Sequence, residues 1–232
     1  MFVLNPQYAY LVFCVGFLVV WVFIYTYSPM TRHEQLQMSL ISIPGGPLSE
    51  LLYLRDYWHP MSAFPVKIGP VHTVIEDMLF AFAFSGIVAV LYQLFTRRSL
   101  ESDSAVRSGV RVACASAAIV SLFLVWLGIN SIYATSAGFF VGALWMVSRR
   151  PDLRRPAILS GILVSLGYLG CLVVFYGLVA NIDELSQSFW KLHDTNLDIR
   201  LVGIPITELI WAFSFGSLFG PLYAFGRHKR YV

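Results

Sequence analysis

Two stretches of the sequence each place acidic residues at the start of a long apolar run. The first is VIEDMLFAFAFSGIVAVLY, residues 74–92, with Glu76 and Asp77; the second is PITELIWAFSFGSLFGPLY, residues 205–223, with Glu208. A carboxyl group that is removed from water favours its neutral form and can then donate a proton. Acids inside a membrane span are costly, which makes them functional candidates by default. These three carboxyl groups are therefore the candidate catalytic residues.

The two stretches repeat one another at an offset of 131 residues. The matching pairs are Ile75 with Ile206, Asp77 with Glu208, Ala81 with Ala212, Phe82 with Phe213, Phe84 with Phe215, Leu91 with Leu222 and Tyr92 with Tyr223. An acid near a helix N-terminus is often no more than a favourable partner for the helix dipole. Recurrence of the acid in both copies favours a functional role instead.

Aromatic rings lie three and seven residues after the acid in each copy, on the same face of a helix. They are Phe80 and Phe84 in the first copy and Trp211 and Phe215 in the second, and a tryptophan, Trp58 or Trp190, precedes each copy. Ring faces attract cations, so a carboxyl group above such rings suits chemistry in which a hydrocarbon is protonated to a carbocation. These six residues are the candidate substrate-binding residues. The alternative is that the rings only pack helices or face lipid.

The composition indicates a membrane protein. The 232 residues are 57% hydrophobic, 16% aromatic and only 12% charged, so we expect the lipid bilayer to be the main solvent. Glycine-rich nucleotide loops, Ser-His-Asp sets and Cys-x-x-Cys pairs are absent from the sequence, so no cofactor is expected. The basic clusters favour contacts with anionic lipid, and nothing indicates a nucleic-acid partner.

Long apolar runs predict an all-α integral membrane protein of seven transmembrane helices. Six runs lie near 8–27, 72–95, 107–128, 130–147, 157–180 and 201–225, and a seventh, less apolar segment covers 36–58. The sequence Pro44-Gly45-Gly46-Pro47 interrupts this segment, which is either a broken transmembrane helix or an interfacial hairpin.

The distribution of positive charge favours the seven-span reading. If the broken segment crosses the membrane, the loops on one side carry 12 lysine and arginine residues and those on the other side carry 4. The positive-inside rule then places the N-terminus outside and the C-terminus in the cytoplasm.

The 131-residue offset maps the third span onto the seventh, which predicts a parallel 3+1+3 repeat whose halves meet around a shared site. We expect a first three-helix repeat at 1–96, a linker and fourth helix at 97–129, and a second repeat at 130–232. The stretch 97–107, RRSLESDSAVR, is predicted to be a flexible linker.

The motifs resemble those of a known family. The block GIPITELIWAFSF (residues 203–215), preceded by Trp190, and VIEDMLFAFAF (residues 74–84) are similar to the Pro-x-Glu-Glu and Phe-Phe motif of the heterodimeric and fused bacterial and archaeal lycopene cyclase domain family. The resemblance implies a cofactor-free enzyme of a bacterial or archaeal cytoplasmic membrane. It also implies a long apolar polyene such as lycopene as substrate, whose linear ends are closed into rings by isomerisation.

The chain departs from the family motif at two positions, with Val74 in place of proline and Thr207 in place of the first acid. Only the first copy keeps paired carboxyl groups, so the resemblance implies that Glu76 and Asp77 catalyse ring closure and that Glu208 assists or binds. In that mechanism one acid protonates a terminal double bond and a neighbouring carboxylate later removes a proton.

Other readings stay open at this point. A small 3+1+3 membrane carrier has the same topology, and a non-catalytic pigment-associated subunit has the same composition. His72 and Glu76 are four residues apart, but no second histidine joins them, so no metal is expected. Every lysine falls in a predicted loop or tail, which excludes a retinal Schiff base. A homo-oligomer or partners from the carotenoid pathway are compatible with the sequence.

Overall fold

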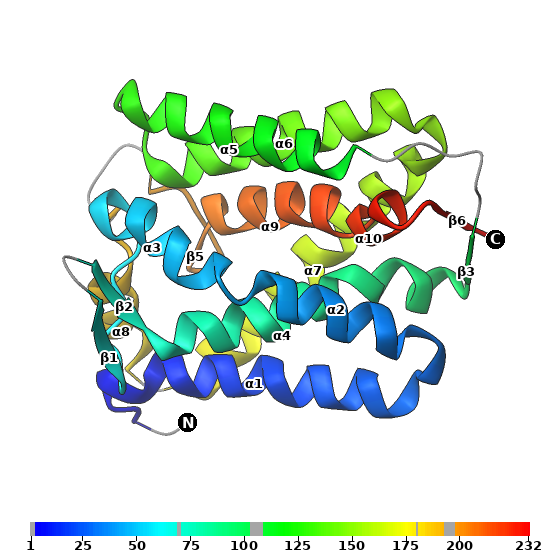
Figure 1. Cartoon of the computed structure of the whole chain (residues 1–232). Helices are drawn as coiled ribbons and strands as arrows, with labels where there is room; N and C mark the ends of the chain where they lie inside the picture. Colours follow the sequence, from blue (N-terminus) through cyan, green and yellow to red (C-terminus); the bar gives the residue numbers. More distant parts are fainter. Residues whose placement is uncertain (1–2, 69–70, 103–108, 180, 193–197) are drawn as a thin grey trace.

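A computed structural model of the chain describes residues 3–68, 71–102, 109–179, 181–192 and 198–232. It is mostly helical, and the long helices run along a common direction (Figure 1). The α-helices are α1 (Pro6–Tyr27), α2 (Arg32–Ser42), α3 (Gly45–Asp56), α4 (Ile75–Thr96), α5 (Val110–Trp126), α6 (Ser131–Arg149), α7 (Arg154–Leu178), α8 (Ile182–Phe189), α9 (Ile206–Phe219) and α10 (Leu222–Gly226). Two 3-10 turns, η1 (Pro29–Thr31) and η2 (Pro151–Leu153), precede α2 and α7.

Short antiparallel strand pairs lie at the two ends of the bundle. The strands are β1 (Pro65–Ile68), β2 (Val71–Val74), β3 (Leu100–Ser102), β4 (Arg200–Leu201), β5 (Ile204–Pro205) and β6 (Lys229–Tyr231), paired as β1 with β2, β3 with β6 and β4 with β5. The β3–β6 pair ties the connection after α4 to the C-terminal segment. Residues 103–107 of the predicted linker lie outside the described residues.

Five helices in the described part of the chain are long and apolar enough to cross a membrane. They cover Pro6–Tyr27, Ile75–Thr96, Ser131–Arg149, Pro151–Leu178 and Ile206–Gly226, and the shorter apolar helix Val110–Trp126 accompanies them. These segments agree with the six predicted apolar runs to within a few residues at most ends. The several long apolar helices indicate an integral membrane protein.

The predicted interruption of the segment 36–58 is confirmed. Helix α2 ends at Ser42 and α3 begins at Gly45, so the chain breaks at Ile43 and Pro44. Pro44 lacks the N–H that would continue the hydrogen-bond ladder of α2. The break divides one predicted span into two short helices.

Local sequence signals mark where α1 and α6 begin. Asn5 caps α1 by accepting a hydrogen bond of 3.0 Å from the Gln7 N–H, and Pro6 occupies the first helical position. Asn130 caps α6 in the same manner, with a bond of 3.2 Å from the Ile132 N–H. These caps satisfy backbone donors that would otherwise be left unpaired at the helix ends.

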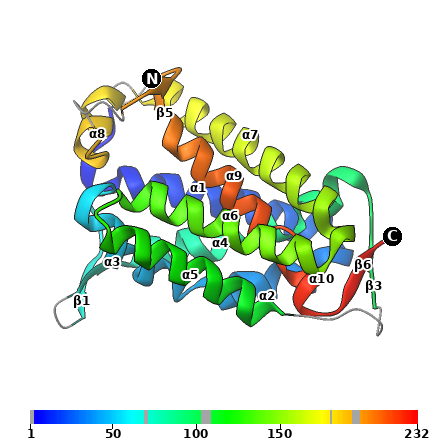
Figure 2. The same cartoon turned by 90° about the horizontal axis from the view of Figure 1, so that it is seen from above.

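The helices pack in two similar groups. Helix α4 packs on α1 and α2, and α9 packs on α6 and α7, while α5 lies against α6. Figure 2 shows the resulting succession α7, α9, α6 and α5. Small residues permit this packing. At Gly216 of α9, for example, an added Cβ atom would lie only 2.8 Å from Val164 of α7.

Helices α4 and α9 begin at the same end of the bundle, beside α8 and the β1–β2 pair (Figure 1). They run in the same direction toward the end that carries β3 and β6. Because each helix carries its acid in its first turn, the two acids are brought to the same end of the molecule.

Candidate functional site

Asp77 lies in the first turn of α4 and is 6% exposed. The Tyr10 hydroxyl of α1 donates a hydrogen bond to its Oδ1 atom. The Oδ2 atom accepts no hydrogen bond from any residue that the structure describes. The carboxyl group is therefore buried, held on one side, and free on the other side to hold or transfer a proton.

Glu76 and Asp77 are neighbours in sequence, but the structure does not bring their carboxyl groups together. The Oε2 atom of Glu76 accepts a hydrogen bond of 2.8 Å from the Ser62 hydroxyl, and Oε1 accepts one of 2.8 Å from the Ala63 N–H. Successive residues on a helix point in directions about 100° apart, which separates the two acids. Glu76 thus binds the segment that precedes β1 instead of joining Asp77.

Glu208 is buried in the first turn of α9 and is held by three donors. The Tyr57 hydroxyl and the Trp190 indole N–H, at 2.9 Å, donate to Oε1, and the Tyr168 hydroxyl donates to Oε2 at 2.9 Å. Hydrogen bonds from neutral donors to a carboxylate stabilise its ionised form. The three donors therefore hold the Glu208 carboxyl group in one position.

The aromatic residues predicted from the two motif helices form one continuous stack. The rings of Phe80 and Phe84 on α4 lie 5.0 Å apart with an interplanar angle of 13°. Phe84 stacks on Trp211 of α9 at 5.7 Å, and Trp211 stacks on Phe215 at 5.2 Å. The stripe of each helix thus faces the stripe of the other and not the surrounding lipid.

Trp58 and Trp190 connect the two halves at the same end of the molecule. Their backbones form an isolated antiparallel bridge, and their ring centroids are 5.3 Å apart. Trp58 lies against Tyr10, whose hydroxyl binds Asp77, while Trp190 binds Glu208 directly. The two tryptophans therefore support both acids.

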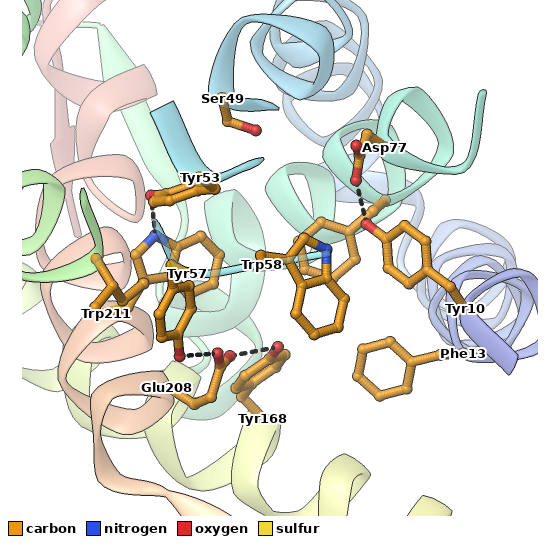
Figure 3. A pocket seen from close by; sticks show the side chains of 12 residues that line it. Tyr10, Phe13, Ser49, Tyr53, Tyr57, Trp58, Asp77, Tyr168, Glu208 and Trp211 are labelled. Carbon is orange, nitrogen blue, oxygen red and sulfur yellow. Dashed lines mark hydrogen bonds between the residues drawn. The ribbon is translucent and has the colours of Figure 1, made fainter. Parts of the chain in front are cut away.

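Asp77 and Glu208 line one small cavity of about 90 Å³ (Figure 3). The lining residues are Tyr10, Phe13, Ser49, Tyr53, Tyr57, Trp58, Asp77, Phe80, Ile132, Tyr168, Glu208 and Trp211. Most of this wall is aromatic. The two acids therefore lie in the wall of one cavity, on opposite sides of it (Figure 3).

A much larger apolar cavity of about 900 Å³ adjoins the small one. The two share Ser49, Tyr53, Asp77, Phe80 and Trp211 in their walls. From Asp77 the larger cavity extends between α2, α3, α4, α5, α6 and α9 as far as Arg227, beyond the end of α10. It therefore runs from the acid end of the bundle to the opposite end.

Three polar partners of the acids, Tyr10, Tyr57 and Tyr168, were not predicted from the sequence, and neither was the buried Glu50. The tyrosines lie 67, 151 and 40 residues from the acids that they bind, so no local spacing reveals them. The sequence could have identified Glu50 as a candidate, because it is an acidic residue inside a predicted membrane segment.

No group of three or more metal-binding side chains occurs among the residues that the structure describes. The side chain of His72, considered above with Glu76, lies outside that part of the chain. Both carboxylate oxygens of Glu76 already accept hydrogen bonds from the chain.

Residues 130–225 match the model of a protein family described as lycopene cyclase. The match covers α6, α7 and α9, including Glu208, Trp211 and Phe215, and it confirms the resemblance expected from the sequence for this region. No curated protein and no solved structure matches the chain. The family match supports a lycopene cyclase-like role in carotenoid biosynthesis and suggests that the protein is an enzyme.

Proposed function

We propose that this protein closes a linear end group of a carotenoid such as lycopene into a ring by acid-initiated cyclisation. One observation carries the proposal: the buried acids Asp77 and Glu208, from the two motif helices, line one small cavity whose wall is mostly aromatic. A protonated hydrocarbon needs a proton donor, a stabiliser for its positive charge and the exclusion of water. This cavity offers all three.

Asp77 is the proposed acid, because it is the carboxyl group with a free oxygen in both cavities. Its proton adds to the terminal double bond of the polyene and leaves a carbocation at the more substituted carbon. An internal double bond of the chain then attacks this carbon, which closes the ring and moves the positive charge into it.

The rings of Phe80 and Trp211 and the carboxylate of Glu208 stabilise the cation before and after ring closure. A cation over an aromatic face gains about 2 kcal/mol or more when both are desolvated. Since both oxygens of Glu208 are occupied by donors, Glu208 acts through its charge and not as the base. The ring proton returns to Asp77, so the reaction is an isomerisation without net redox change and the acid is restored.

The larger cavity is the proposed binding site for the rest of the polyene. It is lined mainly by apolar side chains from α2, α3, α4, α5, α6, α9 and α10, and it meets the small cavity at Asp77 and Phe80. A long hydrocarbon held there from the bilayer would present one end to the acids. The same geometry limits the site to one end of the substrate at a time.

The similar packing of the two helix groups supports the topology expected from the sequence. In this comparison α1 corresponds to α6, the pair α2 and α3 corresponds to α7, and α4 corresponds to α9. Helix α5 lies between the two groups and has no counterpart. We propose seven spans as a parallel 3+1+3 repeat over 1–96, 97–129 and 130–232. The N-terminus then lies outside and the C-terminus in the cytoplasm of a bacterial or archaeal membrane, with the acids near the outer leaflet.

The function is tested by expressing the chain in a bacterium that accumulates lycopene and separating the extracted pigments. We expect the wild-type chain to yield carotenoids with ring end groups, whereas Asp77→Asn leaves lycopene unchanged at an equal amount of inserted protein. Asparagine has nearly the same shape but cannot donate an acidic proton.

Unchanged lycopene with a well-inserted wild-type chain would contradict the proposal. A carrier or a non-catalytic pigment-associated subunit would then be the better reading. Transport in vesicles and pigment co-purification distinguish these two.

A further inference from the structure

A third carboxyl group, that of Glu50, lies beside Asp77. Helix α3 approaches the start of α4 so closely that a Cβ atom added at Gly46 would overlap the backbone carbonyl oxygen of Asp77. This contact places the next turn of α3, which carries Glu50, against the first turn of α4, so that the carboxyl groups of Glu50 and Asp77 are neighbours. Glu50 is 3% exposed.

Apart from the Tyr10 hydroxyl, which binds Oδ1 of Asp77, neither group has a compensating partner among the described residues. Both oxygen atoms of Glu50 and the Oδ2 atom of Asp77 accept no hydrogen bond from the described residues. No lysine, arginine or histidine in the described part of the chain forms an ion pair with either group. Buried charges without donors or counterions are strongly disfavoured, so two adjacent carboxylates cannot both be ionised here.

From these contacts we infer that Glu50 stays protonated and donates a hydrogen bond to Asp77. The inference rests on the proposed function, because its effect is on the acid that starts the reaction. Glu50 does not line either cavity, so it acts on the substrate only through Asp77 and is a positioning residue.

The proposed hydrogen bond from Glu50 to Asp77 becomes stronger during the reaction. Before proton transfer Asp77 is a neutral acid, and its bonds with Tyr10 and Glu50 join neutral groups. When the proton moves to the polyene, Asp77 becomes a carboxylate that accepts from both donors. Hydrogen bonds to an ion are roughly twice as strong as those between neutral groups, so the pair stabilises the charge that develops in the transition state. Glu50 keeps its own proton throughout.

Three variants test this role through the rate of ring formation in isolated membranes. Glu50→Met removes the donor at similar size and is expected to lower kcat by about 10- to 100-fold, the loss of one hydrogen bond to a charged group. Glu50→Gln keeps an N–H donor and is expected to stay within about threefold of wild type. Glu34→Met, a buried glutamate that lines neither cavity, is the matched control and is expected to leave kcat unchanged.

Infrared spectroscopy at neutral pH gives a second measurement that needs no activity. The carbonyl stretch of a protonated carboxyl group is separate from the bands of carboxylates. We expect Glu50→Gln to remove one protonated-carboxyl band and Asp77→Asn to leave that band in place.

The outcomes separate the two proposals. A wild-type chain that does not cyclise lycopene overturns the proposed function, while the infrared spectra still decide whether Glu50 holds a proton. If ring formation occurs and Glu50→Gln is as slow as Glu50→Met, or if Glu50→Gln removes no protonated-carboxyl band, the role of Glu50 as a neutral donor is wrong.

Discussion

The hydroxyl group of Tyr57, at the end of α3, donates a hydrogen bond to Glu208 of α9, although 151 residues separate them. The same hydroxyl lies 2.9 Å from the Thr207 hydroxyl oxygen. Tyr57 belongs to the first group of helices and Glu208 to the second. The second acid therefore reaches its full set of donors only when the two halves of the chain are docked together.

Replacing Glu208 tests its role as a fixed charge. We expect Glu208→Gln to lower the rate of ring formation by about 100-fold, because the glutamine keeps the contacts but removes the negative charge that stabilises the cation. The rate is measured by pigment analysis at matched protein levels. Glu101→Gln, at an exposed position in β3, is the control and is expected to behave as wild type. A Glu208→Gln variant with normal activity would exclude this role.

The neighbouring acid Glu76 is expected to respond differently from Asp77. Glu76→Gln weakens the bonds to Ser62 and Ala63, which should cost about 1–2 kcal/mol of stability and reduce ring formation by less than tenfold. Thermal unfolding in detergent and pigment analysis measure the two effects. If Glu76→Gln abolishes ring formation while Asp77→Asn retains it, the assignment of the acid must be reversed.

Filling the larger cavity should block the polyene. Ala118 on α5 lines this cavity at a distance from the acids, and Ala118→Trp would occupy much of the space there. We expect ring formation to fall by at least about tenfold, since a substrate that needs the whole cavity no longer fits. Ala115→Trp is the matched control, because Ala115 lies on the same helix, is exposed and does not line the cavity. Equal activity of the two variants would argue against a polyene in this cavity.

The close approach of α3 and α4 can be tested at two adjacent glycines. Gly46→Ala must push α3 away from the Asp77 backbone, whereas a Cβ atom at Gly45 would meet no other atom within 4 Å. We expect Gly46→Ala to lose about 1–3 kcal/mol of stability and most of its activity, as crowding in packed sites commonly does. Gly45→Ala should retain the stability and the activity of the wild type. Similar behaviour of the two variants would show that this contact does not position the site.

We expect the stability of the folded protein to depend on pH through Glu34, which lies at the end of the bundle opposite the acids. Glu34 of α2 precedes the predicted second span, and burial raises its pKa from 4.5 to about 8, although the Gln93 hydrogen bond and the Lys229 charge lower it in part. The folded state then holds the proton more tightly than the unfolded chain. The stability from this group is fully present below pH 4.5 and is lost as the pH rises through about 8.

Comparison with Glu34→Gln isolates this effect. Glutamine does not ionise, so the unfolding temperature of the variant should fall less than that of wild type between pH 5 and 8. Parallel curves for the two proteins would mean that Glu34 does not titrate in this range.

The sequence alone determined the membrane character, the approximate apolar segments, the break at Pro44 and the repeated acids of α4 and α9. These features follow from local physics. A helix in hydrocarbon must satisfy its own backbone hydrogen bonds over a span of about 20 residues. Helical spacing likewise places Phe80 on the face of Asp77 and Trp211 on the face of Glu208.

Only the tertiary structure decided which carboxyl groups share a site. The paired acids in the sequence, Glu76 and Asp77, bind different partners, while Asp77 shares a cavity with Glu208. The donors Tyr10, Tyr57 and Tyr168 come from three other segments of the chain. Burial leaves a carboxyl group no water to bind, so its partners are those that packing brings near it, and packing depends on contacts that no local pattern of residues encodes.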